Sequence, residues 1–172
     1  MNKLNTLKIS AALLLMGMGS TMAYAGGITS DITTQTADLT FASTGKATIS
    51  LEAQQDLIAG AFKAGQEIAS GEATATAGTV AYRWTPTSGD ISQANGVSKI
   101  IKIKGTENKN NSITLALVPS TSVGTLTDGG NGWIVPATLN TSKVELSVQN
   151  NQAAVISPDT YTLSVDAAVW GY

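Results

Sequence analysis

The chain has 172 residues and a formal net charge of −2, and it contains neither cysteine nor histidine. The lack of these two residue types excludes disulfide frameworks, cysteine nucleophiles, histidine-based triads and ordinary zinc sites. Charged residues make up only 13% of the chain, with no basic surplus, so we expect no nucleic-acid partner. The acidic residues show no obvious pairing and no glycine-rich phosphate loop occurs, so we expect no enzyme, no metal and no cofactor.

Residues 1–25 have the three-part pattern of a secretory signal peptide. Lys3 and Lys8 precede the apolar stretch Ile9–Met18, and small residues end at Ala25. The apolar stretch is shorter than the roughly 20 residues that a transmembrane helix needs. We therefore expect cleavage after Ala25 and export of the mature chain out of the cytoplasm.

Residues 26–45 are predicted to be a detached strand ahead of one domain, residues 46–172. Within this segment, Ala37–Phe41 alternates apolar and polar side chains, and turn residues ending at Gly45 follow it. Alternation with a period of two is the pattern of a half-buried strand. The mature chain thus carries an extra strand at its start.

The remaining chain is dominated by short runs with the same alternation. Strands that recur about every 10 to 15 residues, with turn residues between them, indicate a β-sandwich of immunoglobulin type, which needs seven strands. Flanking lysines favour an outer position for one of them, Ser98–Lys104. We expect strands at Lys46–Ala53, Thr79–Trp84, Ser98–Lys104, Ser112–Val118, Trp133–Val135, Lys143–Val148 and Thr160–Tyr172.

Two further expectations concern the ends of this domain. Glu52–Ala64 has a helix-like apolar spacing weakened by Gly60, so a helix and a loop are both open. The last strand is predicted to run to Tyr172, so we expect no closing strand after it. A surplus strand at the start and a missing one at the end are the central observation.

The order of signal peptide, alternating extension and sandwich resembles the fimbrial subunits of the chaperone–usher pathway. The similarity is to the cysteine-free subunits of the Saf-like and plague-capsular-antigen-like type. It lies in Ala37–Phe41, followed by a strand at Ala47–Leu51, and in the ending Asp159–Tyr161 with Leu163 and the terminal Gly171-Tyr172. Ile32 departs from the pattern, because it is out of phase with the alternation of Ala37–Phe41.

The resemblance implies an all-β, incomplete immunoglobulin-like sandwich (the pilin fold) with an N-terminal donor-strand extension. A periplasmic chaperone would first lend the missing strand, and at the outer-membrane usher the extension of the next copy would replace it. Such head-to-tail contacts generate a linear fibre on the cell surface, with a tip adhesin as a further partner. The donor side chains would be Ile32, Ala37, Leu39 and Phe41, and the acceptor and chaperone-facing residues Tyr161, Leu163, Val165 and Tyr172.

Adhesion to a host glycan or protein is a second role that the sequence leaves open. Trp133, after a glycine-rich turn, is the best exposed aromatic residue for receptor contact, whereas Trp84 has the phase of a core residue. A lysine cluster gives further contacts, although the same lysines also suit a solvated edge: Lys99, Lys102 and Lys104.

Two other functions of the whole protein remain open. One is a monomeric secreted β-sandwich that binds carbohydrate or protein, with Leu39 and Phe41 inside its own domain. Another is a hydrolase with paired carboxylates.

Overall fold

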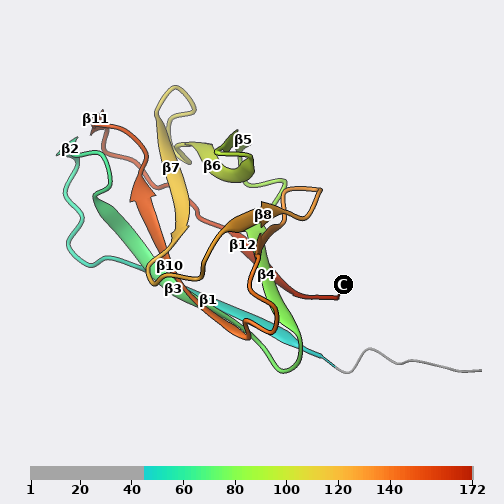
Figure 1. Ribbon diagram of the computed structural model, residues 1–172. Coiled ribbons are helices and arrows are strands. Elements are labelled where there is room, and N and C mark those ends of the chain that lie inside the picture. Colours follow the sequence, from blue (N-terminus) through green and yellow to red (C-terminus); the bar gives the residue numbers. More distant parts are fainter. Residues whose placement is uncertain (1–44, 172) are drawn as a thin grey trace, which may run out of the picture. The chain divides into compact units, whose positions relative to one another are not determined.

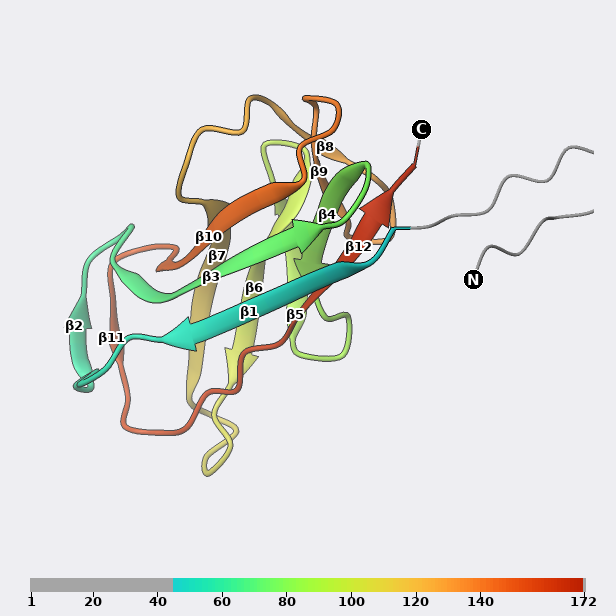
Figure 2. The ribbon, with the colours of Figure 1, turned by 90° about the horizontal axis from the view of Figure 1, so that it is seen from below.

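The computed structural model describes residues 45–171, and within this range the chain is all β with no helix. Its twelve strands form three sheets in which every pair of neighbours is antiparallel (Figures 1 and 2). The strands are β1 (Ala47–Ala53), β2 (Gly60–Phe62), β3 (Glu67–Ala75), β4 (Thr79–Trp84), β5 (Asp90–Ala94), β6 (Val97–Lys104), β7 (Ser112–Pro119), β8 (Leu126–Asp128), β9 (Ile134–Pro136), β10 (Lys143–Asn150), β11 (Ala154–Ile156) and β12 (Val165–Trp170).

The larger sheet has six strands in the order β1-β3-β10-β7-β6-β5. Its strands follow the period-two rule that the sequence shows. In β10, Val144 and Leu146 are buried, whereas Lys143 and Glu145 are exposed. One face of this sheet therefore supplies apolar side chains to a core, and the other carries polar side chains to solvent.

The second sheet has four strands in the order β12-β4-β9-β8. Val80, Tyr82 and Trp84 of β4 point inward and are fully buried. The indole N–H of Trp84 donates a hydrogen bond to the carbonyl of Lys99 on β6, at 3.0 Å, which ties the two sheets together. The prediction that Trp84 belongs to the core is confirmed.

The core lies between these two sheets. Tyr82 and Trp84 of the smaller sheet belong to one cluster with Ile101, Leu117 and Val144 of the larger one. Burying a large apolar side chain stabilises a fold by about 1.5–3 kcal/mol, so this cluster stabilises the sandwich without disulfides. A two-stranded ribbon of β2 and β11 completes the fold at one end of the domain (Figure 2).

Two expectations about the strands are wrong, and one open alternative between a helix and a loop is decided in favour of the loop. The strand with the flanking lysines, β6, is not an outer strand, because β5 pairs with its far side and is itself the edge. The segment Glu52–Ala64 contains the end of β1, a loop and β2, with no helix. The C-terminal strand begins only at Val165, whereas residues 160–164 lie outside any strand.

The last correction has a physical reason. The carbonyl of Thr160 accepts a hydrogen bond from Thr106, while that of Ser164 accepts one from Thr85. The segment is therefore held at its two ends by different parts of the domain. It crosses from the β2–β11 ribbon to the four-stranded sheet before regular pairing with β4 begins.

Candidate functional site

Two edge strands from different sheets lie beside each other on one side of the sandwich. β1 pairs only with β3, and β12 only with β4, among the described residues. Each strand thus has one edge without a strand partner, and the two edges face a common region. We call this region the β1–β12 opening. Free edges of this kind offer backbone N–H and C=O groups to an added strand.

The side chains along the β1–β12 opening are apolar and only half-buried. They pack against the core cluster, yet solvent still reaches them: from β1, Ile49 and Leu51, and from β12 and the segment before it, Tyr161, Leu163, Val165, Ala167 and Val169. Contiguous exposed apolar surface of this kind marks a site that takes a partner.

A pocket of about 410 Å³ lies toward the β2–β11 end of the opening. Its walls include Phe62, Ile113 and Leu163, and the loop after β1 adds Leu57 and Ile58. These last two side chains are 44% and 81% exposed. The pocket has the size and the apolar lining of a site for a large apolar group.

Asp159 fixes one wall of this pocket. Its carboxylate accepts hydrogen bonds from the backbone N–H groups of Glu107, Asn108 and Thr160 and from the side chain of Asn111. Desolvation alone would raise the pKa of Asp159, but these bonds outweigh it and lower the pKa to about 2. The carboxylate lies so close to Gly105 that any side chain there would collide with it. Asp159 therefore ties the start of the β12 segment to the β6–β7 loop.

The structure brings three of the predicted acceptor residues together. Tyr161 and Leu163 line the pocket, and Val165 begins β12 on the same inward face. Tyr172 and the predicted donor side chains lie outside the described residues: Ile32, Ala37, Leu39 and Phe41. The signal peptide and nearly all of residues 26–45 also lie outside them.

The predicted receptor residues fall into separate places. Lys102 and Lys104 are exposed on the outer face of β6, in the six-stranded sheet. Lys99 has the opposite phase, because it lies two residues before the buried Ile101 and therefore on the same face of β6. Trp133 lies in the turn between β8 and β9, two strands of the four-stranded sheet. The lysines and the tryptophan therefore do not form one surface.

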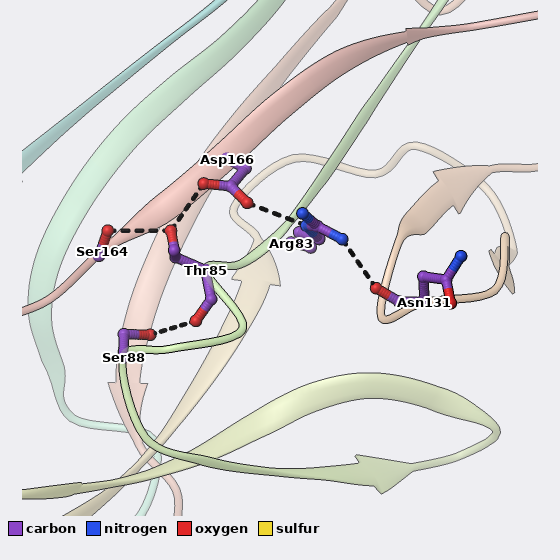
Figure 3. Close-up of polar contacts among 6 residues, drawn as sticks. All are labelled: Arg83, Thr85, Ser88, Asn131, Ser164 and Asp166. Atoms are coloured by element: carbon purple, nitrogen blue, oxygen red, sulfur yellow. Dashed lines mark hydrogen bonds and ion pairs between the residues drawn. The ribbon is translucent and has the colours of Figure 1, made fainter.

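Trp133 instead joins a cluster around Arg83, the sole arginine of the chain, whose hydrogen bonds to Asn131 and Asp166 are drawn in Figure 3. The guanidinium carbon of Arg83 lies 4.3 Å from the centre of the Trp133 ring, in a cation–π contact. Its Nε donates to Asp166 of β12 at 2.9 Å, and its Nη1 donates to the carbonyl of Asn131 at 3.0 Å. The side chains of Arg83 and Asp166 are 21% and 32% exposed.

The network continues along the edge strand. The hydroxyl of Thr85 donates to Asp166 at 2.7 Å and lies 2.9 Å from the hydroxyl of Ser164 (Figure 3). These contacts fix the register of β12 on β4 from the outer face. Sequence reasoning missed this cluster, since its members are up to 83 positions apart. The one hint in the sequence was Arg83 itself, the single arginine, which the alternation places on the outer face of the strand next to the inward-facing Trp84.

Two other kinds of site are not found in the part of the chain that the structure describes. No group of three or more acidic side chains there is arranged to hold a metal ion. No helix in the same range is long and apolar enough to span a membrane.

No protein-family model and no curated protein sequence matches the chain. Solved structures do match. The Salmonella adhesin SafD is 20% identical with a TM-score of 0.56, over 71% of this chain and 82% of SafD. A structure of the AAF fimbriae of enteroaggregative Escherichia coli is 16% identical with a TM-score of 0.55, over 71% and 86% of the two chains.

A third match is HdaB, the minor tip subunit of the E. coli Hda pilus. It is 15% identical with a TM-score of 0.52, over 70% of this chain and 80% of HdaB. The structures come from fimbriae and their adhesins, so the chain has the all-β, immunoglobulin-like fold of fimbrial subunits. The predicted fold class is confirmed for residues 45–171.

Proposed function

We propose that this protein is a structural subunit of a bacterial surface fimbria and polymerises by donor-strand exchange. The observation that carries the proposal is the β1–β12 opening. Two strand edges that have no strand partner within residues 45–171 flank a row of half-buried apolar side chains, and an apolar pocket lies at one end. A strand inserted there would pair with both edges and cover the row.

The strand we propose for this place is residues 26–45 of another copy. Its side chains for the opening are Ile32, Ala37, Leu39 and Phe41, and they would meet Tyr161, Leu163 and Val165. Each large side chain so buried contributes about 1.5–3 kcal/mol, so several together approach the stability of a whole domain. A contact of that strength opens slowly. Because it joins head to tail, it extends into a linear homopolymer.

Assembly by this route requires partners outside the chain. We propose a periplasmic chaperone that occupies the opening first, with Tyr172 at the end of the edge that it contacts. An outer-membrane usher then exchanges it for the next copy, and a tip adhesin is a further partner. The signal peptide, residues 1–25, would direct the chain to the periplasm, and the product is an extracellular fimbrium. No catalytic residue, metal or cofactor belongs to this function.

Gel mobility in detergent, unheated against boiled, tests the proposal on surface-released protein. We expect a ladder of multiples that collapses to one band on boiling, because strand-exchanged contacts resist detergent at room temperature but not heat. A single monomer band under both conditions would overturn the proposal. It would favour the alternative, a monomeric β-sandwich that binds carbohydrate or protein.

A chain that lacks residues 26–45 but keeps its signal peptide shows which segment is the donor. We expect this chain to give no ladder, and an equal ladder would show that the donor lies elsewhere. Adding purified chain with an intact extension to it should produce heterodimers, because the truncated chain keeps its β1–β12 opening. If the extension instead completed its own domain, no heterodimer would form.

A role in adhesion is the second part of the proposal. The matched AAF fimbriae are described for fibronectin binding and biofilm formation, and fimbriae of this fold present their outer faces to the surroundings. On this chain the receptor residues that we predicted are Trp133, Lys99, Lys102 and Lys104. Since the lysines and Trp133 lie on different sheets, they represent two separate surfaces that mutations can distinguish.

A further inference from the structure

The β8–β9 turn and the outer face of the four-stranded sheet form a small site that the assembly proposal does not use. Along β12 the side chains alternate, so Asp166 points away from the β1–β12 opening while Val165 and Ala167 pack on the core. A strand inserted in the opening therefore leaves Asp166 and its neighbours uncovered. This site can therefore bind a ligand whether or not the chain polymerises by donor-strand exchange.

The turn holds Trp133 in one orientation. Gly130, Asn131 and Gly132 have φ values of 79°, 51° and 81°, so three successive residues are left-handed. The N–H of Trp133 donates to the carbonyl of Gly130 at 3.0 Å, which closes the turn. Glycine adopts positive φ without strain and asparagine tolerates it, and Arg83 on the neighbouring strand β4 holds the turn further through its bond to the carbonyl of Asn131.

A second tryptophan, Trp170, packs against the β8–β9 turn at Gly129. A Cβ added to Gly129 would lie 2.7 Å from the ring of Trp170 on β12, so only glycine fits between them. Arg83 and Trp170 thus hold the turn at two points on the outer face. Trp133 therefore loses little conformational entropy when a ligand binds to it, which favours affinity.

Hydrogen-bonding capacity remains around the ring of Trp133. Of the five N–H groups of Arg83, two have partners among the described residues. The side-chain amide of Asn131 is exposed, and neither it nor the indole N–H of Trp133 has a partner in residues 45–171. The carboxylate oxygens of Asp166 each accept one bond and retain a second lone pair.

We propose that Trp133, Arg83, Asp166 and Asn131 form a binding site for a neutral hexopyranose. A pyranose ring offers an apolar C–H face that stacks on an aromatic ring and hydroxyl groups that both donate and accept. Arg83 covers one face of the Trp133 ring, so the half-exposed indole offers its other face and its edges. The hydroxyl groups of a sugar on that other face then meet the side-chain amide of Asn131 and the indole N–H, while Arg83 and its partner Asp166 hold the ring from the opposite face.

The local charge selects a neutral sugar over an acidic one. Asp166 forms an ion pair with Arg83, and Asp128 lies in the same hairpin. The cation is therefore already compensated, and an acidic sugar would meet two carboxylates. The exposed lysines that would favour an acidic ligand belong to the other sheet.

Saturation-transfer NMR on the secreted, full-length protein tests this site. The probes are the methyl glycosides of glucose, galactose, mannose and N-acetylglucosamine, together with lactose and 3′-sialyllactose. We expect transfer to at least one neutral probe, and Trp133→Ala should weaken that binding by about tenfold or more. Trp133→Phe should restore part of it, because phenylalanine keeps a ring for stacking.

A second variant separates binding from folding. Asn131→Gly removes the amide but keeps the left-handed turn, because glycine adopts φ near the 51° of Asn131 without strain. It should also weaken neutral-sugar binding, whereas the control Lys102→Ala should not. Three results would overturn the site: no transfer to any neutral probe, unchanged binding in both turn variants, or transfer to sialyllactose alone that Lys102→Ala abolishes. The detergent ladder, measured on the same samples, reports polymerisation independently.

Discussion

Two parts of the sandwich have the same alternating sequence pattern but different exposure. In the middle of the large sheet, Leu117, Leu146 and Val148 are at most 1% exposed. Along the β1–β12 opening, Leu51, Leu163 and Val165 have the same inward phase and pack on the same core, yet all are half-buried. The side chains are equally apolar, so the difference lies in their neighbours.

The neighbours differ because β7 and β10 have strand partners on both sides, while β1 and β12 have one each among the described residues. A central strand shields its inward side chains from both directions, whereas an edge strand shields them from one. The residues of the opening therefore have the sequence pattern of core residues, but in the structure they are partly exposed to solvent. Substitutions in the two regions test this distinction.

The largest effect is expected from a charge placed in the opening. Leu163→Asp should abolish the detergent-resistant ladder, because an inserted strand would bury an unpaired carboxylate against the apolar row. The isolated chain should still fold, since Leu163 is only half-buried. Gel mobility and circular dichroism measure the two effects separately.

The matched control is Leu139→Asp. Leu139 is 63% exposed and lies between β9 and β10, away from the residues of the pocket. We expect this variant to keep a full ladder. A ladder in Leu163→Asp as strong as in the control would show that polymers form without the opening.

A smaller effect separates the two regions by stability alone. Leu117→Ala should destabilise the chain by about 2–5 kcal/mol, the range for a fully buried leucine that leaves a cavity. Leu163→Ala should cost less than about 2 kcal/mol, because solvent already reaches that side chain in the folded state. Urea unfolding of monomer-sized protein gives both values. Equal losses would mean that Leu163 is as enclosed as the core and that the opening is filled within one chain.

The alternation of side chains predicts most of the architecture. The strands at Thr79–Trp84, Ser112–Val118 and Lys143–Val148 match β4, β7 and β10 closely, because each packs one face on a single core. β5 was missed since its sequence, DISQA, carries few apolar residues, and its pairing with β6 depends on backbone bonds that no pattern encodes. β3 was missed because its inward residues include small ones such as Ala69 and Gly71.

In the candidate sites too, local alternation predicted some residues, whereas others are brought together only by the fold. Tyr161 and Leu163 were found from alternation, since their phase survives although their segment is not a strand. Leu57 and Ile58 were assigned to a helix-like spacing, and only the fold brings them to the pocket. The pairing of Arg83 with Asp166 spans 83 positions. Nothing local in the sequence specifies such a partner.

A pH-dependent effect is expected where the opening meets the β6–β7 loop. Asp159→Asn should destabilise the chain by less than Leu117→Ala, because asparagine keeps an acceptor oxygen but turns an amide toward the N–H donors. Hydrogen bonding lowers the pKa of Asp159 to about 2 from its ordinary 3.8. A lowered pKa stabilises the fold above the ordinary value, and this contribution is lost as the pH falls through the lowered one. The difference between variant and original chain should therefore be full near neutral pH and shrink between about pH 4 and 2.

Thermal unfolding across this pH range measures the difference. Asp56→Asn is the control, because Asp56 is exposed and has a φ of 59°, a conformation that asparagine also adopts. A difference for Asp159→Asn that stayed constant down to pH 2 would show that the carboxylate charge is not what the loop recognises.

The smallest effect should be a gain in stability at the core. The hydroxyl of Tyr82 is buried and has no hydrogen-bond partner among the described residues, and burial raises the pKa of this phenol. A buried hydroxyl without a partner costs about 1–3 kcal/mol, so Tyr82→Phe should stabilise the chain by about 1 kcal/mol. Tyr161→Phe is the matched control, because the Tyr161 hydroxyl donates to the carbonyl of Ser157 at 3.1 Å near the surface. It should be neutral or slightly destabilising in the same urea titration. A loss of stability in Tyr82→Phe would contradict this prediction and show that the Tyr82 hydroxyl has a hydrogen-bond partner in the folded protein.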